Sequence, residues 1–406
     1  MKREQNLPWH TVTSASESPT EPQTQTTELI TNAQPGITRR PPENITDYRY
    51  KHLHDANVFF HATPPPDIGI IIDKIVSPTP SRDRQVKLQE ISNSFYARCI
   101  TLAQDAHDEA DWRELIQSMI TFLIDSKLTF VRESNWRMEL KPEMPQPNVR
   151  FDFAKITAPA QQGKKGQDET SSLLKRQMQN ENDGPITLNN TFHSPNTAPL
   201  ISTITTPSPD ITLGIKNEAL ISEIATQMSL SGSDRRSVER FLNYLDESTD
   251  KEGNDKEPVL IMRPMENEGL VFPFAAVECK AYATGSPIFA AQNQAAGSGA
   301  CGLNQQRSVN ELVKRVTDLD VSSEHPIFFS ICTEGPIHEL WVHYMFPHTH
   351  SFNMKLLKTY NGLLPEQAEA FVIAADNVFR WGVDEFLKSV SQRLGEIFKA
   401  TTEATA

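Results

Sequence analysis

The sequence predicts a mixed α/β (α+β) fold, in which helices flank a central mixed sheet, with a disordered N-terminal tail and a disordered internal insert. Short apolar runs of strand length alternate with segments of helical periodicity, which indicates the folded part. A nearly unbroken apolar run at 270–279 is typical of a central strand buried on both faces. Two polar, low-complexity stretches indicate the unfolded parts.

Composition limits the class of protein. Of the 406 residues 38% are hydrophobic, and 28 prolines outnumber 17 glycines, which suits a chain that is unfolded over a sizeable part of its length. The formal net charge of -13 disfavours a tight, non-specific coat on nucleic acid, so any nucleic-acid contact would have to be local. No CxxC spacing occurs, which argues against a zinc ribbon or a disulfide framework for the four cysteines, Cys99, Cys279, Cys301 and Cys332.

Four segments follow from these patterns. Residues 1–45 form a polar tail, residues 46–158 hold helices and the first strands, residues 159–198 form a flexible insert, and residues 199–400 form the main core. Whether residues 46–158 belong to that core is left open by the sequence. The N-terminal sequence lacks the apolar core of a signal peptide, and no stretch approaches transmembrane length. We therefore expect an intracellular protein of the cytosol or nucleus, without a membrane partner.

The segment before the insert is expected to contain two helices and two strands. Apolar residues at helical spacing predict a helix over 87–106. Asp111 with Glu114 predicts a capping box at the start of a second helix. The runs 128–132 and 148–156 have the composition of strands.

The segment after the insert continues the alternation of strands and helices. Strands are expected at 201–205, 211–215, 270–279, 326–333 and 337–346. Helices are expected at 218–230, 237–245, 288–296 and 309–319, followed by a last helix from Pro365 towards Phe398. Glu334-Gly335-Pro336 predicts a hairpin turn, and Trp381-Gly382 is expected to kink or interrupt the last helix.

Three charged residues form the most informative constellation. Glu278 and Lys280 close the central strand, and residues two apart on a strand point to the same side. Such a pair is costly without a partner, which Asp210 could supply by sharing a divalent cation. Two carboxylates with water suit Mg²⁺ or Mn²⁺, so Asp210 and Glu278 are the expected metal ligands. Lys280 would orient or deprotonate the attacking water, or offset the charge of the phosphorane.

This constellation resembles the PD-(D/E)XK nuclease superfamily. The likeness rests on Pro209-Asp210 and on Glu278-x-Lys280 after an apolar strand. In several branches a Gln on the following helix supports the site; Gln292 and Gln294 are both available, and Gln294 has the more typical distance. The runs 278–301 and 328–341 are similar to nuclease-like domains of uncharacterised fungal proteins. The resemblance implies a restriction-endonuclease-like sheet over about 200–400 and a catalytic set of Asp210, Glu278, Lys280 and Gln294.

Two features depart from the superfamily pattern. The superfamily often carries an acidic residue on a helix before the first strand; Glu114 is the candidate here, and Glu109 and Glu90 compete with it. The interval from Asp210 to Glu278 is long, so a helical pair and an acidic loop must lie between the two strands. The structural alternative is an ion pair at a strand end, with Asp210 as an ordinary turn residue.

The other notable polar and aromatic residues are interpreted as structural. His338 and His343 differ by five positions and so face opposite sides of one strand, which disfavours a shared metal. His348 and His350 could share a side, but no third ligand is placed. A solvated helix face explains Arg307, Lys314 and Arg315, and core or sheet packing explains Trp341 and Tyr344.

The sequence favours a Mg²⁺-dependent nuclease that hydrolyses phosphodiester bonds of nucleic acid. Two alternatives stay open: a catalytically silent nuclease-like module that binds nucleic acid or protein, and an interaction protein whose disordered arms recruit partners. A basic groove beside Glu278 would favour the nuclease or the silent nuclease-like module. An exposed apolar patch would favour the interaction protein. The sequence does not distinguish DNA from RNA, or endonuclease from exonuclease action.

Overall fold

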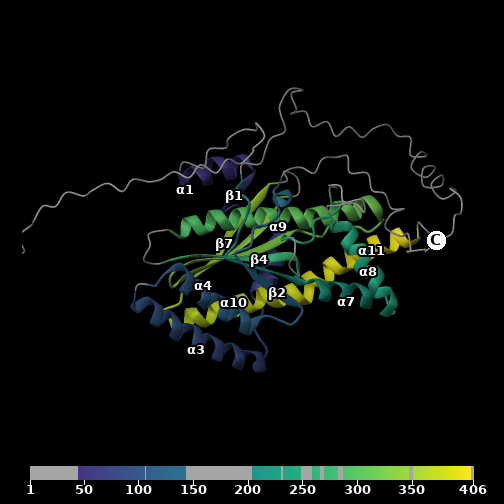
Figure 1. Ribbon diagram of the computed structural model, residues 1–406. Helices are drawn as coiled ribbons and strands as arrows, with labels where there is room; N and C mark the ends of the chain where they lie inside the picture. Colours follow the sequence, from purple (N-terminus) through teal and green to yellow (C-terminus); the bar gives the residue numbers. More distant parts are fainter. Residues whose placement is uncertain are drawn as a thin grey trace, which may run out of the picture. The chain divides into compact units, whose positions relative to one another are not determined.

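The computed structural model describes residues 44–105, 107–142, 204–229, 232–247, 258–265, 269–281, 287–346 and 351–403 (Figure 1). The tail over 1–43, the strand expected at 148–156 and the insert over 159–198 lie outside the described residues. His348 and His350 lie outside them too. None of the described helices is both long and apolar enough to cross a membrane.

In the described part of the chain, seven strands form one mixed sheet in the order β1-β7-β6-β5-β4-β3-β2. β1 runs parallel to β7 and β4 runs parallel to β5, whereas all other neighbours are antiparallel. The strands are β1 (Val58–Phe60), β2 (Leu128–Arg132), β3 (Ile211–Lys216), β4 (Leu270–Lys280), β5 (Ile327–Glu334), β6 (Ile337–Met345) and β7 (Phe352–Asn361). The mixed α/β class expected from the sequence is confirmed.

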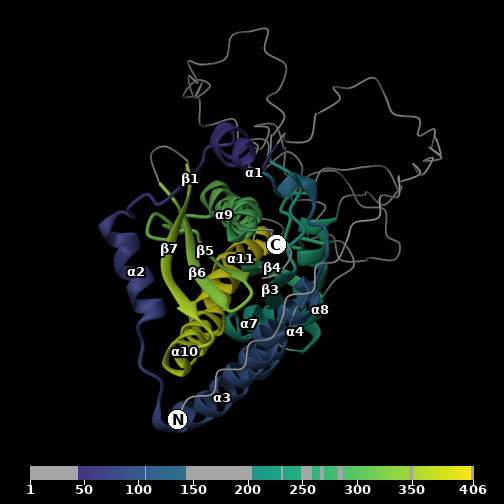
Figure 2. The same cartoon turned by 90° about the vertical axis from the view of Figure 1, so that its left-hand side faces the viewer.

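Helices cover both faces of this sheet. The long helix α9 lies across one face, and α3, α4 and α10 lie on the other (Figures 1 and 2). The helices are α1 (Ile45–Asp47), η1 (Tyr48–Leu53), α2 (Pro66–Val76), α3 (Arg82–Gln104), α4 (Glu109–Leu123), η2 (Met138–Leu140), α7 (Asn217–Gln227), α8 (Gly232–Asp246), α9 (Ile288–Val316), α10 (Pro365–Trp381), η3 (Gly382–Phe386) and α11 (Leu387–Glu403). The π-helix η3 interrupts the last helical run at Gly382, as expected.

The segment before the insert supplies both edges of the sheet. β1 pairs with β7 at one edge, and β2 pairs with β3 at the other. The described residues before the insert therefore share a single sheet with the main core, which the sequence had left open. β4 lies inside the sheet and every one of its residues is buried, as its apolar run predicts.

α9 differs from the sequence expectation, because the helices expected at 288–296 and 309–319 are one continuous helix. Gly297, Gly299 and Gly302, which follow the expected end of the first helix, lie inside α9. Their small size lets α9 approach the sheet closely: a Cβ atom at Gly302 would stand 2.5 Å from the ring of Phe328 on β5. The GxGxxG spacing of residues 297–302 therefore serves helix–sheet packing and does not form a phosphate-binding turn between a strand and a helix.

Gly302→Ala is expected to destabilise the protein by about 1–3 kcal/mol, because the added methyl group overlaps a fully buried ring. Gly395→Ala on α11 is the matched control, since its new Cβ would meet its nearest neighbour at an ordinary 3.6 Å. Alanine at that helical position should be neutral or stabilise by about 0.5–1 kcal/mol. Urea unfolding of both variants measures the difference; equal stabilities would contradict the close-packing role of Gly302.

Three further expectations are corrected. Asp108, rather than Asp111, caps α4: its side chain accepts hydrogen bonds from the backbone N–H groups of Ala110 and Asp111, and Asp111 completes the capping box. The strand expected at 201–205 is wrong where it is described, because Ile204 and Thr205 are not in a strand. The motif residues Pro209-Asp210 were expected to lie on a strand that pairs with the Glu278 strand, whereas Asp210 immediately precedes β3. β7 and α2 were not anticipated.

Candidate functional site

The register between β3 and β4 brings the first two motif residues to the same end of the sheet. Ile211 pairs with Val277, so Asp210 stands opposite Glu278 on the neighbouring antiparallel strand. The Oδ2 atom of Asp210 accepts a hydrogen bond of 2.7 Å from the backbone N–H of Cys279. The long chain segment between the two strands therefore does not disrupt their pairing.

Glu278 is an acid in an unfavourable environment. It is only 1% exposed, and the one hydrogen bond that its carboxylate accepts from a described side chain comes from the Ser298 hydroxyl at 3.5 Å. Burial raises the pKa of Glu278 well above its ordinary value, and the nearby Asp210 carboxylate raises it further. Lys280 and the Ser298 hydrogen bond act in the opposite direction. Asp210 and Glu278 thus form a pair of acidic groups that repel each other at the buried end of the sheet.

Lys280 lies beside this pair and is held by two oxygen atoms. Its Nζ atom donates to the carbonyl of Cys279 at 2.7 Å and to Oε1 of Glu109 at 3.2 Å. Glu109 occupies the first turn of α4 because Asp108 caps that helix. Of the acidic candidates considered from the sequence, Glu109 is the one that reaches the motif, whereas Glu114 is exposed on the same helix.

α4 also supplies a second cation to the site. Arg113 is one helical turn after Glu109, and its Nη1 atom lies 3.3 Å from Oδ1 of Asp210. Arg113 also forms an ion pair with Glu133, which follows β2. Sequence reasoning missed Arg113, since its position depends on the tertiary packing of α4 against the strand ends.

The helix after the Glu-x-Lys strand contributes a different residue from the one expected. Gln294 is exposed on α9, and it is Ser298, one turn later, that donates to Glu278. Gln292 is buried elsewhere, where it accepts a hydrogen bond from Arg49 and donates one to Glu339 at 2.8 Å. The structure brings Asp210, Glu278 and Lys280 together and leaves the Gln294 side chain exposed to solvent.

The helix η1 contacts the segment that leads into the site. The hydroxyl of Tyr48 lies 2.9 Å from Oγ1 of Thr205 and accepts a hydrogen bond from the Thr205 backbone N–H. Burial raises the pKa of Tyr48, and the negative charge of Glu278 adds to that shift. Tyr48 therefore links η1 to the segment that leads into Asp210. No sequence pattern marks this contact, which joins residues 157 positions apart.

The donor set is compatible with a hard divalent cation. Among the described residues, no group of three or more His, Cys, Asp or Glu side chains is arranged to hold a metal ion. Mg²⁺ does not require such a group, because it usually keeps several waters and binds through one or two carboxylates. The carboxylate oxygen atoms of Asp210 and, once its proton is released, of Glu278 have the chemistry that Mg²⁺ or Mn²⁺ prefers, so metal binding would displace the Glu278 proton.

A family model for a domain of unknown function, DUF7924, matches residues 142–394, which is more than half of the chain. The chain belongs to the DUF7924 family. No curated protein and no solved structure matches it. The matched part of this DUF7924 protein contains Asp210, Glu278 and Lys280, whereas Glu109 and Arg113 of α4 precede it.

The conspicuous histidines of the DUF7924 domain are structural, as expected from their spacing. His338 stacks on Phe371 of α10 with ring centroids 4.7 Å apart, while His343 lies against Gly299 of α9 on the opposite face of β6. Burial lowers the pKa of each imidazole to about 3. Both are therefore neutral at physiological pH and have no access to a substrate. Trp341 and Tyr344 are fully buried, also as predicted, and so is Cys279.

Proposed function

We propose that this DUF7924 protein is a metal-dependent nuclease of the PD-(D/E)XK kind that hydrolyses phosphodiester bonds in nucleic acid. The observation that carries the proposal is the register that sets Asp210 opposite Glu278, with Lys280 on the same strand end. Glu109 on the helix before β2 adds an acidic residue at the place where the superfamily often has one. These four residues come from three separate segments of the sequence, namely the start of α4, the residue before β3 and the end of β4.

The residues present fit a divalent cation in chemical terms. Asp210 and Glu278 would hold it, since a cation would offset the cost of a buried Glu278 charge, which is the main cause of its raised pKa, and the repulsion from Asp210. When bound, Mg²⁺ lowers the pKa of its water and offsets charge on the phosphate. Lys280 is fixed by the Cys279 carbonyl and by Glu109, so its ammonium group is preorganised to orient the nucleophilic water. Arg113 provides a guanidinium group that can bind phosphate in a fork geometry.

Nucleic-acid cleavage tests the proposal. Purified full-length protein is incubated with duplex DNA, single-stranded DNA and RNA, with Mg²⁺, with Mn²⁺ or with a chelator. We expect cleavage of at least one substrate that requires the metal and falls about 100-fold or more in Lys280→Ala, because the residue that prepares the nucleophile is lost. Glu278→Ala should abolish cleavage as well. Lys314→Ala, an exposed α9 lysine, is the control that should retain activity.

The result that contradicts the proposal is cleavage that survives both Lys280→Ala and Glu278→Ala, because it would come from another site or from a contaminant. His343 variants should lose activity only in proportion to lost folded protein, since His343 is buried against α9. Thermal melting of each variant separates loss of chemistry from loss of fold.

A silent nuclease-like module is the second candidate, and one observation favours it. Both oxygen atoms of Asp210 already have partners within the protein, namely Arg113 and the Cys279 N–H, and Lys280 is paired with Glu109. A site in which the charges of Asp210, Arg113 and Lys280 already have internal partners can persist for structural reasons after catalysis is lost. Metal-independent binding of nucleic acid without cleavage by the wild-type protein would favour this second candidate.

A further inference from the structure

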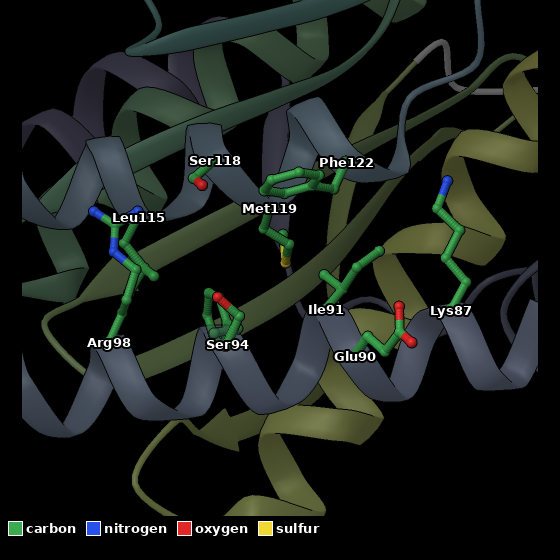
Figure 3. Close-up of a pocket in the computed structure, with 10 residues that line it drawn as sticks. Lys87, Glu90, Ile91, Ser94, Arg98, Leu115, Ser118, Met119 and Phe122 are labelled. Carbon is green, nitrogen blue, oxygen red and sulfur yellow. The ribbon is translucent and has the colours of Figure 1, made fainter.

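A hollow of about 220 Å³ lies between α3 and α4 and shares no lining residue with the Asp210–Glu278 site (Figure 3). Figure 3 shows two short side chains, Ser94 on α3 and Ser118 on α4, at the middle of the hollow, where longer side chains would fill the space. The floor is apolar and buried, and consists of Ile91, Phe95, Leu115 and Met119. We refer to this feature as the α3–α4 hollow.

One wall of the hollow carries an aromatic side chain that is exposed to solvent. Phe122 projects from α4 along the rim and is 57% exposed, although Phe is a residue type that usually becomes buried. A ligand that lies in the hollow would cover this ring together with the apolar floor. Binding would then remove apolar surface from water, which is the main favourable contribution in most small-molecule sites.

The two ends of the hollow carry positive charge. Lys87 and Arg98 lie on one stripe of α3 and are separated by three turns, or about 16 Å of helix. Lys87 has Glu90 one turn away, which offsets part of its charge. The guanidinium of Arg98 makes no ion pair or hydrogen bond with any residue in the described ranges. The Arg98 end therefore carries an uncompensated charge suited to an anion.

We propose that the α3–α4 hollow binds a small amphipathic monoanion, with its apolar body over Phe95 and Met119 and its carboxylate on Arg98. The size is sufficient, since an apolar cavity of about 150 Å³ holds a benzene-sized molecule. Guanidinium groups bind carboxylates through two parallel hydrogen bonds, which fixes the orientation of such a ligand. The hollow is confined to the turns between Lys87 and Arg98, which suits a medium-chain or arylalkyl carboxylate better than a protein segment. This site is independent of the proposed nuclease activity.

Binding of sodium octanoate to the full-length protein tests the proposal, with octanol and octylamine as uncharged and cationic analogues of the same length. Saturation-transfer NMR and calorimetry should show that octanoate binds and that the two analogues bind more weakly. Arg98→Gln should weaken octanoate by about fivefold or more and leave octanol unchanged, because only the charge-assisted contact is lost. Ser118→Leu should weaken all apolar binding by about tenfold, because the side chain fills the hollow.

Lys314→Gln on α9 is the charge-matched control and should bind octanoate as the wild type does. Thermal melting establishes that the Ser118→Leu protein is folded, and Arg98→Gln provides an independent test if it is not. The proposal is overturned if wild-type protein does not bind octanoate, if octylamine binds as tightly as octanoate, or if Arg98→Gln and folded Ser118→Leu bind octanoate as the wild type does.

Discussion

Replacing Glu278 by Gln is expected to stabilise the metal-free protein at neutral and alkaline pH. Burial and Asp210 raise the pKa of Glu278 well above its ordinary value near 4.5. Above pH 4.5 the unfolded chain releases this proton while the folded protein retains it, so the unfolding free energy of the wild type falls as pH rises towards the raised pKa. Glutamine removes the ionisation, and its amide can donate to Asp210.

Glu278→Gln should therefore exceed the wild type in unfolding free energy at pH 8, and the difference should grow as the pH rises from 5 to 8. Urea unfolding of wild type and Glu278→Gln from pH 5 to pH 8 measures it. Glu114→Gln on the exposed side of α4 is the control and should retain the wild-type pH dependence. If the unfolding free energies of wild type and Glu278→Gln change with pH in the same way, the pKa of Glu278 is not raised in the folded protein. Mg²⁺ should raise the stability of wild type at pH 8 and leave the variant unchanged.

The acid limb of the stability curve should depend on the two buried histidines. Each has a folded pKa of about 3, whereas an unfolded imidazole titrates near 6.5. Because the unfolded chain takes up protons first, the unfolding free energy is maintained above pH 6.5 and falls as the pH drops from 6.5 towards 3. Each histidine should contribute a loss of about 2–3 kcal/mol between pH 6.5 and 4.5.

His338→Leu is the variant that tests this contribution. Its Nδ1 atom is buried without a hydrogen-bond partner among the described residues, so leucine should cost little at pH 7. The variant should lose stability less steeply than the wild type below pH 6.5. His54→Gln, at an exposed position, should follow the wild-type curve. An unchanged acid slope in His338→Leu would mean that His338 is protonated in the folded state.

The central strand and its motif could be predicted because their signals are local. An apolar run of strand length with two charges at its end specifies β4 and places Glu278 and Lys280 on it. β3, β5 and β6 were anticipated for the same reason, since each has the composition of a strand and a turn signal at its boundary. β7 was missed although apolar and polar residues alternate over 352–356; the alternation breaks at Leu356-Leu357, where the register with β6 shifts.

Two predicted site residues, Glu114 and Gln294, were wrong because the start of one helix and the packing of another were not predicted correctly. Choosing Asp111 as the cap of α4 placed Glu114 near the expected acidic position, whereas the Asp108 cap puts Glu109 there. The Asp108-x-x-Asp111 spacing was a readable signal for the true start. The orientation of α9 over the sheet, which presents Ser298 and not Gln294 to Glu278, depends on glycine contacts with β5 and β6 that no local pattern encodes. The contributions of Arg113 and Tyr48 likewise depend on contacts between distant segments.

The most direct test of the account is Mn²⁺ binding to the metal-free protein, measured by calorimetry and by electron paramagnetic resonance. The wild type should bind Mn²⁺ at one saturable site. Glu278→Gln and Asp210→Asn should each weaken that binding by about tenfold or more, because each removes one of the two proposed ligand carboxylates. Glu114→Gln, on the same helix as Glu109 but exposed, should bind as the wild type does. Equal Mn²⁺ affinity in wild type and Glu278→Gln, or no saturable binding by the wild type, would contradict a metal site at Asp210 and Glu278.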